Sequence, residues 1–295
     1  EKVADKGFGI GYQDGKVIFV ERAVPGDVVD VRLYKNKANF AKGYPIRFTG
    51  YSPDRVEPFC SHFGHCGGCH WQNLPYERQL AAKTQLVADA LQRIARIQGA
   101  EVQPAIGADP IRYYRNKLEY TFSNQRWLRP EELNTGIDKW SDTLGYHVPK
   151  FFDKVLALEH CYLQADPSNA MRDFMRDRGH AMGIPFYDLR ERTGVLRNLV
   201  LRNNRQGDWL VVLVASEDSP RIRELLDAFG ERFPEVRSLW LMVNTKPNSS
   251  TGDLEALHHF GEDAILERLG EREYRIGPKS FFQTNPHQAE KLVAL

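Results

Sequence analysis

The sequence predicts an α+β protein in which a small N-terminal β-barrel precedes a mixed α/β domain. Short apolar runs with regular turns fill residues 1–50, and strand-like and helix-like patterns alternate from about residue 111 onward. The chain has 295 residues, which is enough for two or three compact units with separate cores. Its hydrophobic share of 42% and charged share of 27% are ordinary for a globular protein.

The predicted barrel consists of short strands joined by tight turns. Asp14-Gly15 separates two apolar runs, which is a strong hairpin signal. Pro25-Gly26 marks a second turn, and an apolar run follows from Val28. Short strands at regular spacing are typical of a small closed barrel. One basic loop carries candidates for phosphate contacts, namely Lys35, Lys37 and Lys42.

A long helix is predicted after residue 72, with Asn73 as its cap and Pro75 in its first turn. Its apolar positions fall on one stripe, which predicts an amphipathic packing helix; they are Leu80, Val87, Leu91 and Ile94.

The remaining elements follow from periodicity and turn chemistry. Strands are expected at 114–122, 154–158, 195–202, 209–215 and 239–244, and helices at 166–182 and 221–233. Asn285-Pro286 begins a last helix by the same capping logic, but the chain stops at Leu295 with no stop signal. We therefore expect the chain to be truncated.

The bulk charge excludes some classes of protein. The net charge is +1, so any nucleic-acid surface must be local rather than global. There is no apolar stretch of about 18 residues, and we expect no membrane span. The first residues are charged and lack the apolar region of a signal peptide, so the predicted location is cytoplasmic.

Four cysteines form the most specific pattern in the chain. Cys60, Cys66 and Cys69 lie within ten residues, and Cys161 follows far downstream. This spacing suits a metal site better than a disulfide scaffold. Four thiolates can hold either zinc or an iron–sulfur cluster, and the spacing alone leaves both open. Four nearby histidines are interpreted as bystanders, namely His62, His65, His70 and His160.

The isolated fourth cysteine favours the cluster, because zinc ribbons usually bring two Cys-x2-4-Cys pairs. The run His65-Cys66-Gly67-Gly68-Cys69-His70 with its outlying cysteines resembles the iron–sulfur signature of the RNA uracil-5-methyltransferase family. Asp5-Lys6-Gly7-Phe8-Gly9 resembles its N-terminal TRAM domain. Further stretches resemble its central domain and the entry to its methyltransferase domain, namely Tyr114-Arg115-Asn116-Lys117, 196–202 and Ser280-Phe281-Phe282-Gln283-Thr284-Asn285.

The resemblance implies a division of the chain into three parts. Residues 1–51 would form an OB-like TRAM barrel that binds RNA. Residues 52–275 would form a central domain with a [4Fe-4S] cluster on Cys60, Cys66, Cys69 and Cys161. Residues 276–295 would begin a Rossmann-like domain that binds S-adenosylmethionine. The cluster would be structural, because it ties a loop to a distant strand end.

The resemblance also implies a reaction, the methylation of uridine C5 in 23S ribosomal RNA or in transfer RNA. In that family a flipped uracil is attacked at C6 by a cysteine thiolate, its C5 takes the methyl group, and a carboxylate removes the C5 proton. All four cysteines here match cluster ligands, so the chain holds no catalytic residue of this kind. We expect the 295-residue chain alone to be inactive, and to be a monomer.

Four residues are the candidates for contacts with RNA and cofactor. By its match to the family motif, Gln283 is expected to bind S-adenosylmethionine, a ligand that suits an amide because an amide both donates and accepts hydrogen bonds. Phe281 is expected to pack near the flipped base, and Arg115 and Lys117 to contact RNA. The alternatives are a solvent-facing glutamine, a core phenylalanine and a solvated charged strand face. Arg112, Arg126 and Arg129 add to the same basic interval, in which Glu119 is the one acidic residue.

Two other classes of protein compete with this interpretation. Radical S-adenosylmethionine methylthiotransferases also carry TRAM domains, but their clusters need a Cys-x3-Cys-x2-Cys spacing, whereas the first gap here is five residues. A non-catalytic RNA-binding module with structural zinc is consistent with the missing nucleophile. Visible absorption separates a cluster from zinc.

Overall fold

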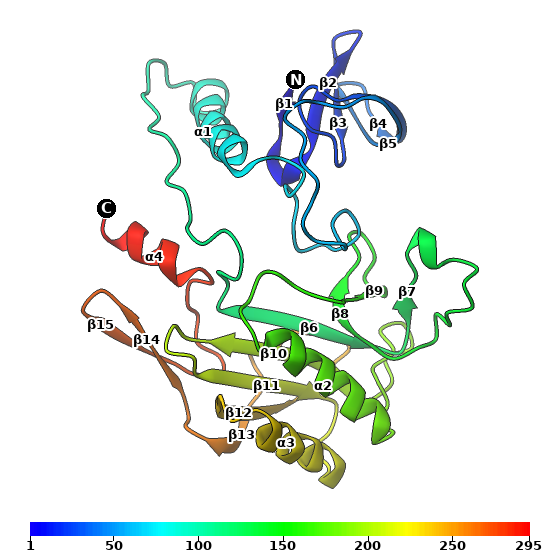
Figure 1. Ribbon diagram of the computed structural model, residues 1–295, viewed down its shortest axis with the longest axis vertical. Coiled ribbons are helices and arrows are strands. Elements are labelled where there is room, and N and C mark those ends of the chain that lie inside the picture. The colour runs from blue at the N-terminus through cyan, green and yellow to red at the C-terminus, as the bar shows by residue number, and fades with distance from the viewer. The chain divides into compact units, whose positions relative to one another are not determined.

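The computed structural model describes residues 1–295, except for the side chain of Asp5. The chain divides into two compact units, 1–107 and 108–295. The boundaries predicted after residues 51 and 275 do not coincide with this division and stay predictions. The chain contains both helices and sheets in separate segments, so the α+β class is confirmed (Figure 1).

The first unit begins with a five-stranded sheet in the order β1-β2-β3-β5-β4. The elements are β1 (Lys2–Val3), the 3-10 turn η1 (Asp5–Gly7), β2 (Gly9–Gln13), β3 (Lys16–Val20), β4 (Val28–Asn36) and β5 (Phe40–Gly50). The predicted hairpin is present, since β2 pairs with β3 in antiparallel fashion around Asp14 and Gly15. Both turn residues have positive φ, at 50° and 77°, which is the geometry that an Asp-Gly pair favours.

The loop that holds three cysteines and the helix α1 (Tyr76–Arg93) complete the first unit. The predicted cap is wrong, because Asn73 donates its side-chain amide to Arg22 O at 3.0 Å and Pro75 is the residue before the helix. The predicted apolar packing face is only partly present. Leu80 and Leu91 are half-buried, but Val87 is 52% and Ile94 82% exposed, and no residue of α1 is fully buried.

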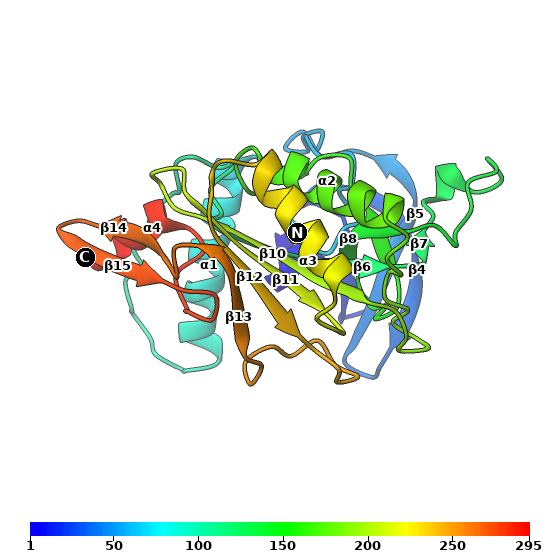
Figure 2. The same cartoon turned by 90° about the horizontal axis from the view of Figure 1, so that it is seen from below.

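The second unit is built on an eight-stranded sheet in the order β13-β12-β11-β10-β6-β8-β9-β7 (Figure 2). Its strands are β6 (Lys117–Ser123), β7 (Arg126–Trp127), β8 (Thr143–His147), β9 (Val155–Ala157), β10 (Leu196–Asn203), β11 (Trp209–Ala215), β12 (Val236–Val243) and β13 (Ala256–Gly261). The other elements are η2 (Pro130–Glu132), α2 (Ser168–Ala181), α3 (Pro220–Arg232), the hairpin β14 (Ile265–Leu269) with β15 (Arg272–Ile276), and α4 (Pro286–Val293).

The two faces of this sheet have different covers. Helices α2 and α3 lie on one face, and the buried face of α3 consists of Ile222, Leu225, Leu226 and Phe229 (Figure 1). On the other face Val200, Val212 and Trp240 pack with Ile265 and Ile276 of the β14–β15 hairpin. Side chains alternate between the two faces along each strand, so adjacent residues of β10 serve opposite layers.

Helix α4 begins as the sequence predicted. The Asn285 side chain accepts a hydrogen bond from the Gln288 amide at 3.0 Å, and Pro286 occupies the first turn. Within the described residues, no helix combines the length and the apolar composition that a membrane crossing requires.

Candidate functional site

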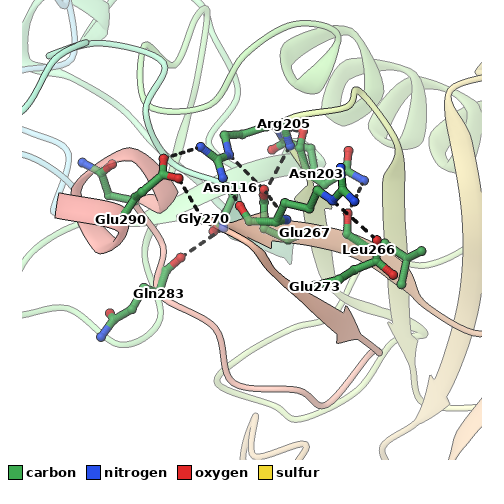
Figure 3. Close-up of polar contacts among 12 residues, drawn as sticks. Asn116, Asn203, Arg205, Leu266, Glu267, Gly270, Glu273, Gln283 and Glu290 are labelled. Atoms are coloured by element: carbon green, nitrogen blue, oxygen red, sulfur yellow. Dashed lines mark hydrogen bonds and ion pairs between the residues drawn. The ribbon is translucent and has the colours of Figure 1, made fainter. Parts of the chain in front are cut away.

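The segment 280–285 lies between β15 and α4 in the second unit and is held through its backbone carbonyls. Arg202 Nη1 donates to Ser280 O at 2.9 Å. The side-chain amide of Asn116 donates to Gln283 O at 3.0 Å, and the Asn116 backbone N–H donates to Thr284 O at 2.9 Å (Figure 3). The carbonyl of Asn116 in turn accepts from the Asn203 N–H at 3.0 Å. The segment is therefore fixed at the ends of β6 and β10.

Side chains alternate along this fixed segment. Phe282 packs against the apolar cluster under the β14–β15 hairpin, and its ring lies 5.6 Å from that of Tyr274. Phe281 is 87% exposed, and Gln283 is exposed too. Figure 3 shows the Gln283 side chain pointing away from the contacts that hold its carbonyl. Because the backbone is held and these two side chains are free, an aromatic ring and an amide are presented on a rigid support.

An ion-pair network centred on one buried carboxylate fixes helix α4 next to this segment. Glu267 is fully buried and accepts from Arg205 Nε at 3.0 Å, while Arg205 Nη1 reaches Glu290 of α4 at 2.8 Å (Figure 3). Glu290 also accepts from the Gly270 N–H at 2.9 Å. The network joins the β10–β11 turn, the β14–β15 hairpin and α4.

Three cations lie at the start of β6 and the end of β10. Lys117 is half-buried and stands opposite Arg202 in the strand register, while Arg115 precedes β6. Burial and the neighbouring Arg202 charge lower the pKa of Lys117, although exposed Glu119 acts in the opposite direction. Burial lowers the pKa of Arg202 too. The structure therefore brings the predicted Arg115 and Lys117 beside the segment that carries Phe281 and Gln283.

Two other arginines of the predicted basic interval do not join this group. Arg126 and Arg129 both contact Glu132, which is 7% exposed and caps η2. Arg129 also pairs with Glu159 at 3.1 Å. Both arginines are therefore paired within the fold. Their acidic partners, Glu132 and Glu159, lie beyond the interval 112–129, so the charge pattern of that interval did not reveal the pairing.

Two of the three candidate lysines of the N-terminal unit, Lys35 and Lys42, rest on aromatic rings. Lys42 Nζ lies 5.1 Å from the ring centre of Phe8 and 5.6 Å from that of Phe19. Lys35 lies 5.4 Å from the ring centre of Phe40. Cations over aromatic faces keep their charge at the surface, so these positions remain candidates for phosphate contacts.

Three of the four cysteines lie in one loop of the first unit, and each is a half-buried thiol. The Gly68 N–H lies 3.4 Å from Cys66 Sγ, and the Cys66 N–H donates to His62 O at 2.9 Å. The Cys60 N–H lies 3.3 Å from Gln72 Oε1. Amide N–H groups directed at sulfur favour a thiolate, which is the form that binds metals.

Cys161 belongs to the second unit and is buried. Its backbone is held on both sides by Asn169, which accepts from the Cys161 N–H at 2.8 Å and donates to its carbonyl at 3.2 Å. Arg172, fully buried, donates to Asn169 Oδ1 at 2.9 Å. The Cys161 backbone is therefore held by buried hydrogen bonds.

The predicted cluster stays a prediction. Among the described residues, no three or more His, Cys, Asp or Glu side chains form a group that could hold a metal ion. The donor set itself fits an iron–sulfur cluster, since four thiols are present and an amide N–H is directed at the sulfur of one of them.

Several residues of the site were missed from the sequence. Asn116 and Arg202 hold the segment 280–285, and Glu267 holds Arg205, but a periodicity analysis assigns no role to single polar residues. The available signals were the runs 114–117 and 196–202, which contain Asn116 and Arg202.

The chain is similar to known proteins over nearly its whole length. It is 44% identical over 289 residues to an "Uncharacterized RNA methyltransferase" of Porphyromonas gingivalis, which covers 96% of the chain and 62% of the relative. A protein of the same description from Bacteroides thetaiotaomicron is 40% identical over 99% of the chain and 66% of the relative. The chain therefore spans about two thirds or less of the length of these relatives.

One solved structure shares the fold. The Pyrococcus abyssi tRNA (uracil-54, C5)-methyltransferase, determined in complex with S-adenosyl-L-homocysteine, superposes with a TM-score of 0.68 at 24% identity, covering 99% of this chain and 62% of that one. Residues 1–46 match the TRAM domain family. The chain thus begins with a TRAM domain and is similar along nearly all of its length to RNA methyltransferases.

Proposed function

We propose that the chain supplies the RNA-binding part of an enzyme that methylates uridine C5 in RNA with S-adenosylmethionine. The observation that carries the proposal is the pair of exposed side chains, Phe281 and Gln283, on a backbone held by Asn116 and Arg202. An aromatic ring suits stacking on an unpaired base, and an amide suits a zwitterionic ligand. The similarity to RNA methyltransferases over 96% and 99% of the chain supports the coarser part of the proposal, the methylation of RNA.

The roles of the residues follow from their positions. Phe281 stacks on the flipped uracil, and Gln283 hydrogen-bonds the cofactor, which supplies the methyl group. Arg115 and Lys117 contact the RNA backbone at the start of β6. The reacting nucleophile and base are not among these residues. The inactivity of the chain by itself stays a prediction, and the similarity to RNA methyltransferases does not support it.

The substrate is proposed to be 23S ribosomal RNA, with transfer RNA as the alternative. The alternative rests on the substrate named for the Pyrococcus abyssi structure, which shares the fold. A monomeric protein in the cytoplasm is the expected state.

Deleting the coding gene tests the substrate. We expect 5-methyluridine to disappear from one position of 23S ribosomal RNA, as measured by mass spectrometry of nuclease fragments, and to return when the gene is restored. Unchanged 5-methyluridine in both ribosomal and transfer RNA would contradict the proposed function. Loss from transfer RNA alone would contradict only the choice of substrate.

We also propose that the four cysteines hold a [4Fe-4S] cluster with a structural role. What supports it is the set of four thiols, the Gly68 N–H directed at Cys66 Sγ, and the hydrogen-bonded Cys161 backbone. When bound, the group supplies a covalent cross-link between the cysteine loop and Cys161. Asn169 and Arg172 keep the Cys161 backbone in place.

Anaerobic purification tests the cluster. We expect the wild-type protein to be brown, with iron and sulfide in equal amounts, and Cys161→Ser to lose most of its visible absorption. His65→Ala is the control in the same loop region and should keep its colour. A colourless wild-type protein that contains zinc would favour the structural-zinc alternative instead.

A further inference from the structure

A like-charge pair stands on two neighbouring strands of the second unit. Lys117 of β6 lies directly opposite Arg202 of β10 in an antiparallel register. Like charges at directly opposed positions of a sheet are destabilising. The fold therefore places two cations where their mutual repulsion costs stability.

Burial makes this arrangement less favourable still. Arg202 is 4% exposed and Lys117 is half-buried, so both have lost much of their hydration. Burial and the Arg202 charge lower the pKa of Lys117. Among the described residues, no carboxylate lies within ion-pair distance of either one; Arg202 has a carbonyl, Ser280 O, as its hydrogen-bond partner.

Other buried cations of this unit are compensated by an acidic group or by several carbonyls. Arg172, fully buried, is paired with Asp173 at 2.9 Å. Arg197, 4% exposed, donates to three carbonyl oxygens, those of Asn244, Lys246 and Asn248. Removing a charge from water is costly unless an opposite charge or hydrogen bonds compensate. Arg202 has one carbonyl as its hydrogen-bond partner and faces Lys117, so this pair is less well compensated, and an anion from outside the chain would supply the missing charge.

We propose that Lys117 and Arg202 bind one phosphate group of an RNA strand whose neighbouring base stacks on Phe281. Arg202 donates to the carbonyl of Ser280, the residue before Phe281, so the cations and the exposed ring share one support. A nucleotide carries a planar base and a phosphate, which matches the two parts of this site. The assignment rests on the proposed function and identifies how its substrate is held.

The carboxylate of S-adenosylmethionine is the other anion to consider. That cofactor also carries an ammonium and a sulfonium group, so its net charge is positive and two cations would repel it. An RNA strand is a polyanion, and its affinity rises with each cation that it neutralises. The charge of the site therefore favours RNA phosphate.

Lys117→Met tests the site through two quantities that should change in opposite directions, the melting temperature and the affinity for RNA. Because the substitution removes a desolvated charge opposite Arg202, we expect the melting temperature to rise by about 2 °C. Affinity for a fluorescent single-stranded oligouridylate should fall about fivefold at moderate salt, and the slope of log affinity against log salt should fall by about 0.7. Arg221→Met is the control, since Arg221 is an exposed cation on α3.

The outcomes separate the phosphate site from the proposed function. A wild-type protein that does not bind oligouridylate would overturn both. If wild type binds but Lys117→Met keeps its affinity and salt slope, the phosphate site is wrong and the function stands. A fall in melting temperature would show that Lys117 serves the fold. Displacement of the oligonucleotide by S-adenosylmethionine would show that the cations hold the cofactor.

Discussion

Replacing Glu267 by Gln should lower the free energy of unfolding of the protein by about 3 kcal/mol. The Glu267 side chain is fully buried and accepts from Arg205 Nε at 3.0 Å, from the Arg205 N–H at 3.2 Å and from the Arg268 N–H at 3.1 Å. Without its charge, the half-buried Arg205 guanidinium loses its buried partner and keeps only Glu290, at 2.8 Å, as an acidic one. Removing one member of a buried ion pair is far more costly than removing an exposed one.

Glu273→Gln on the same hairpin is the matched control (Figure 3). Glu273 and Arg268 are 3.8 Å apart, with more than half of each side chain exposed, so the loss should stay below about 1 kcal/mol. Denaturant unfolding measures both variants, and hydrogen exchange should show α4 opening first in Glu267→Gln. Equal losses of unfolding free energy in the two variants would mean that burial does not increase the contribution of Glu267 to stability.

Replacing Asp27 by Asn should destabilise the N-terminal unit by about 3 kcal/mol. The Asp27 side chain is 1% exposed and accepts from Arg55 Nη2 at 2.6 Å. It also accepts from the Val24 N–H at 2.8 Å and the Ser52 N–H at 3.0 Å. The carboxylate closes the turn before β4 onto the loop after β5, and an amide cannot replace its charge or both of its acceptor oxygens.

The pH dependence of the stability also distinguishes wild type from Asp27→Asn. Although burial alone would raise it, hydrogen bonds from Arg55, Val24 and Ser52 hold the pKa of Asp27 below its usual value. A depressed pKa contributes stability above the unfolded-state value of about 4, and that contribution is lost as the pH falls through the folded-state value. Wild type should therefore lose stability below about pH 4 more steeply than Asp27→Asn.

Asp30→Asn is the control for Asp27, because Asp30 is also an aspartate paired with an arginine in this unit. It lies 2.6 Å from Arg47, but 47% of its side chain is exposed and so is 70% of the Arg47 side chain. Thermal unfolding should barely change in this variant. If Asp30→Asn destabilised the protein as much as Asp27→Asn, burial would not be the cause of the effect.

Local signals in the sequence were reliable where one or two residues determine the backbone conformation. Asp14-Gly15 predicted the β2–β3 hairpin, because few residue pairs tolerate two positive φ angles. Asn285-Pro286 predicted the start of α4, because the cap and the fixed φ act within one turn. Asn73 has the same capping chemistry, but its side chain is taken by Arg22 O, a partner 51 residues away in sequence.

The candidate site could be predicted only in part from the sequence, because some of its contacts join residues that are far apart in the chain. Phe281, Gln283, Arg115 and Lys117 stand in recognisable runs, and in the structure Phe281 and Gln283 are exposed. The opposition of Lys117 and Arg202 depends on the register between β6 and β10, which periodicity does not specify. The pairing of Arg126 and Arg129 with Glu132 depends on the η2 turn. The exposure of Val87 and Ile94 on α1 could not be predicted, because periodicity shows which residues share a face but not what covers that face.

The hydrogen bond from Asn116 to Gln283 joins residues that are 167 positions apart in sequence. Closing so long a loop is entropically unfavourable, and contacts of high sequence separation form late in folding. During synthesis, Arg115 and Lys117 leave the ribosome long before Phe281 exists, so the two halves of the site cannot meet until the second unit is nearly complete. Competence to hold RNA next to Phe281 is thus a property of the finished fold, and partly folded chains offer the basic strand without the aromatic ring.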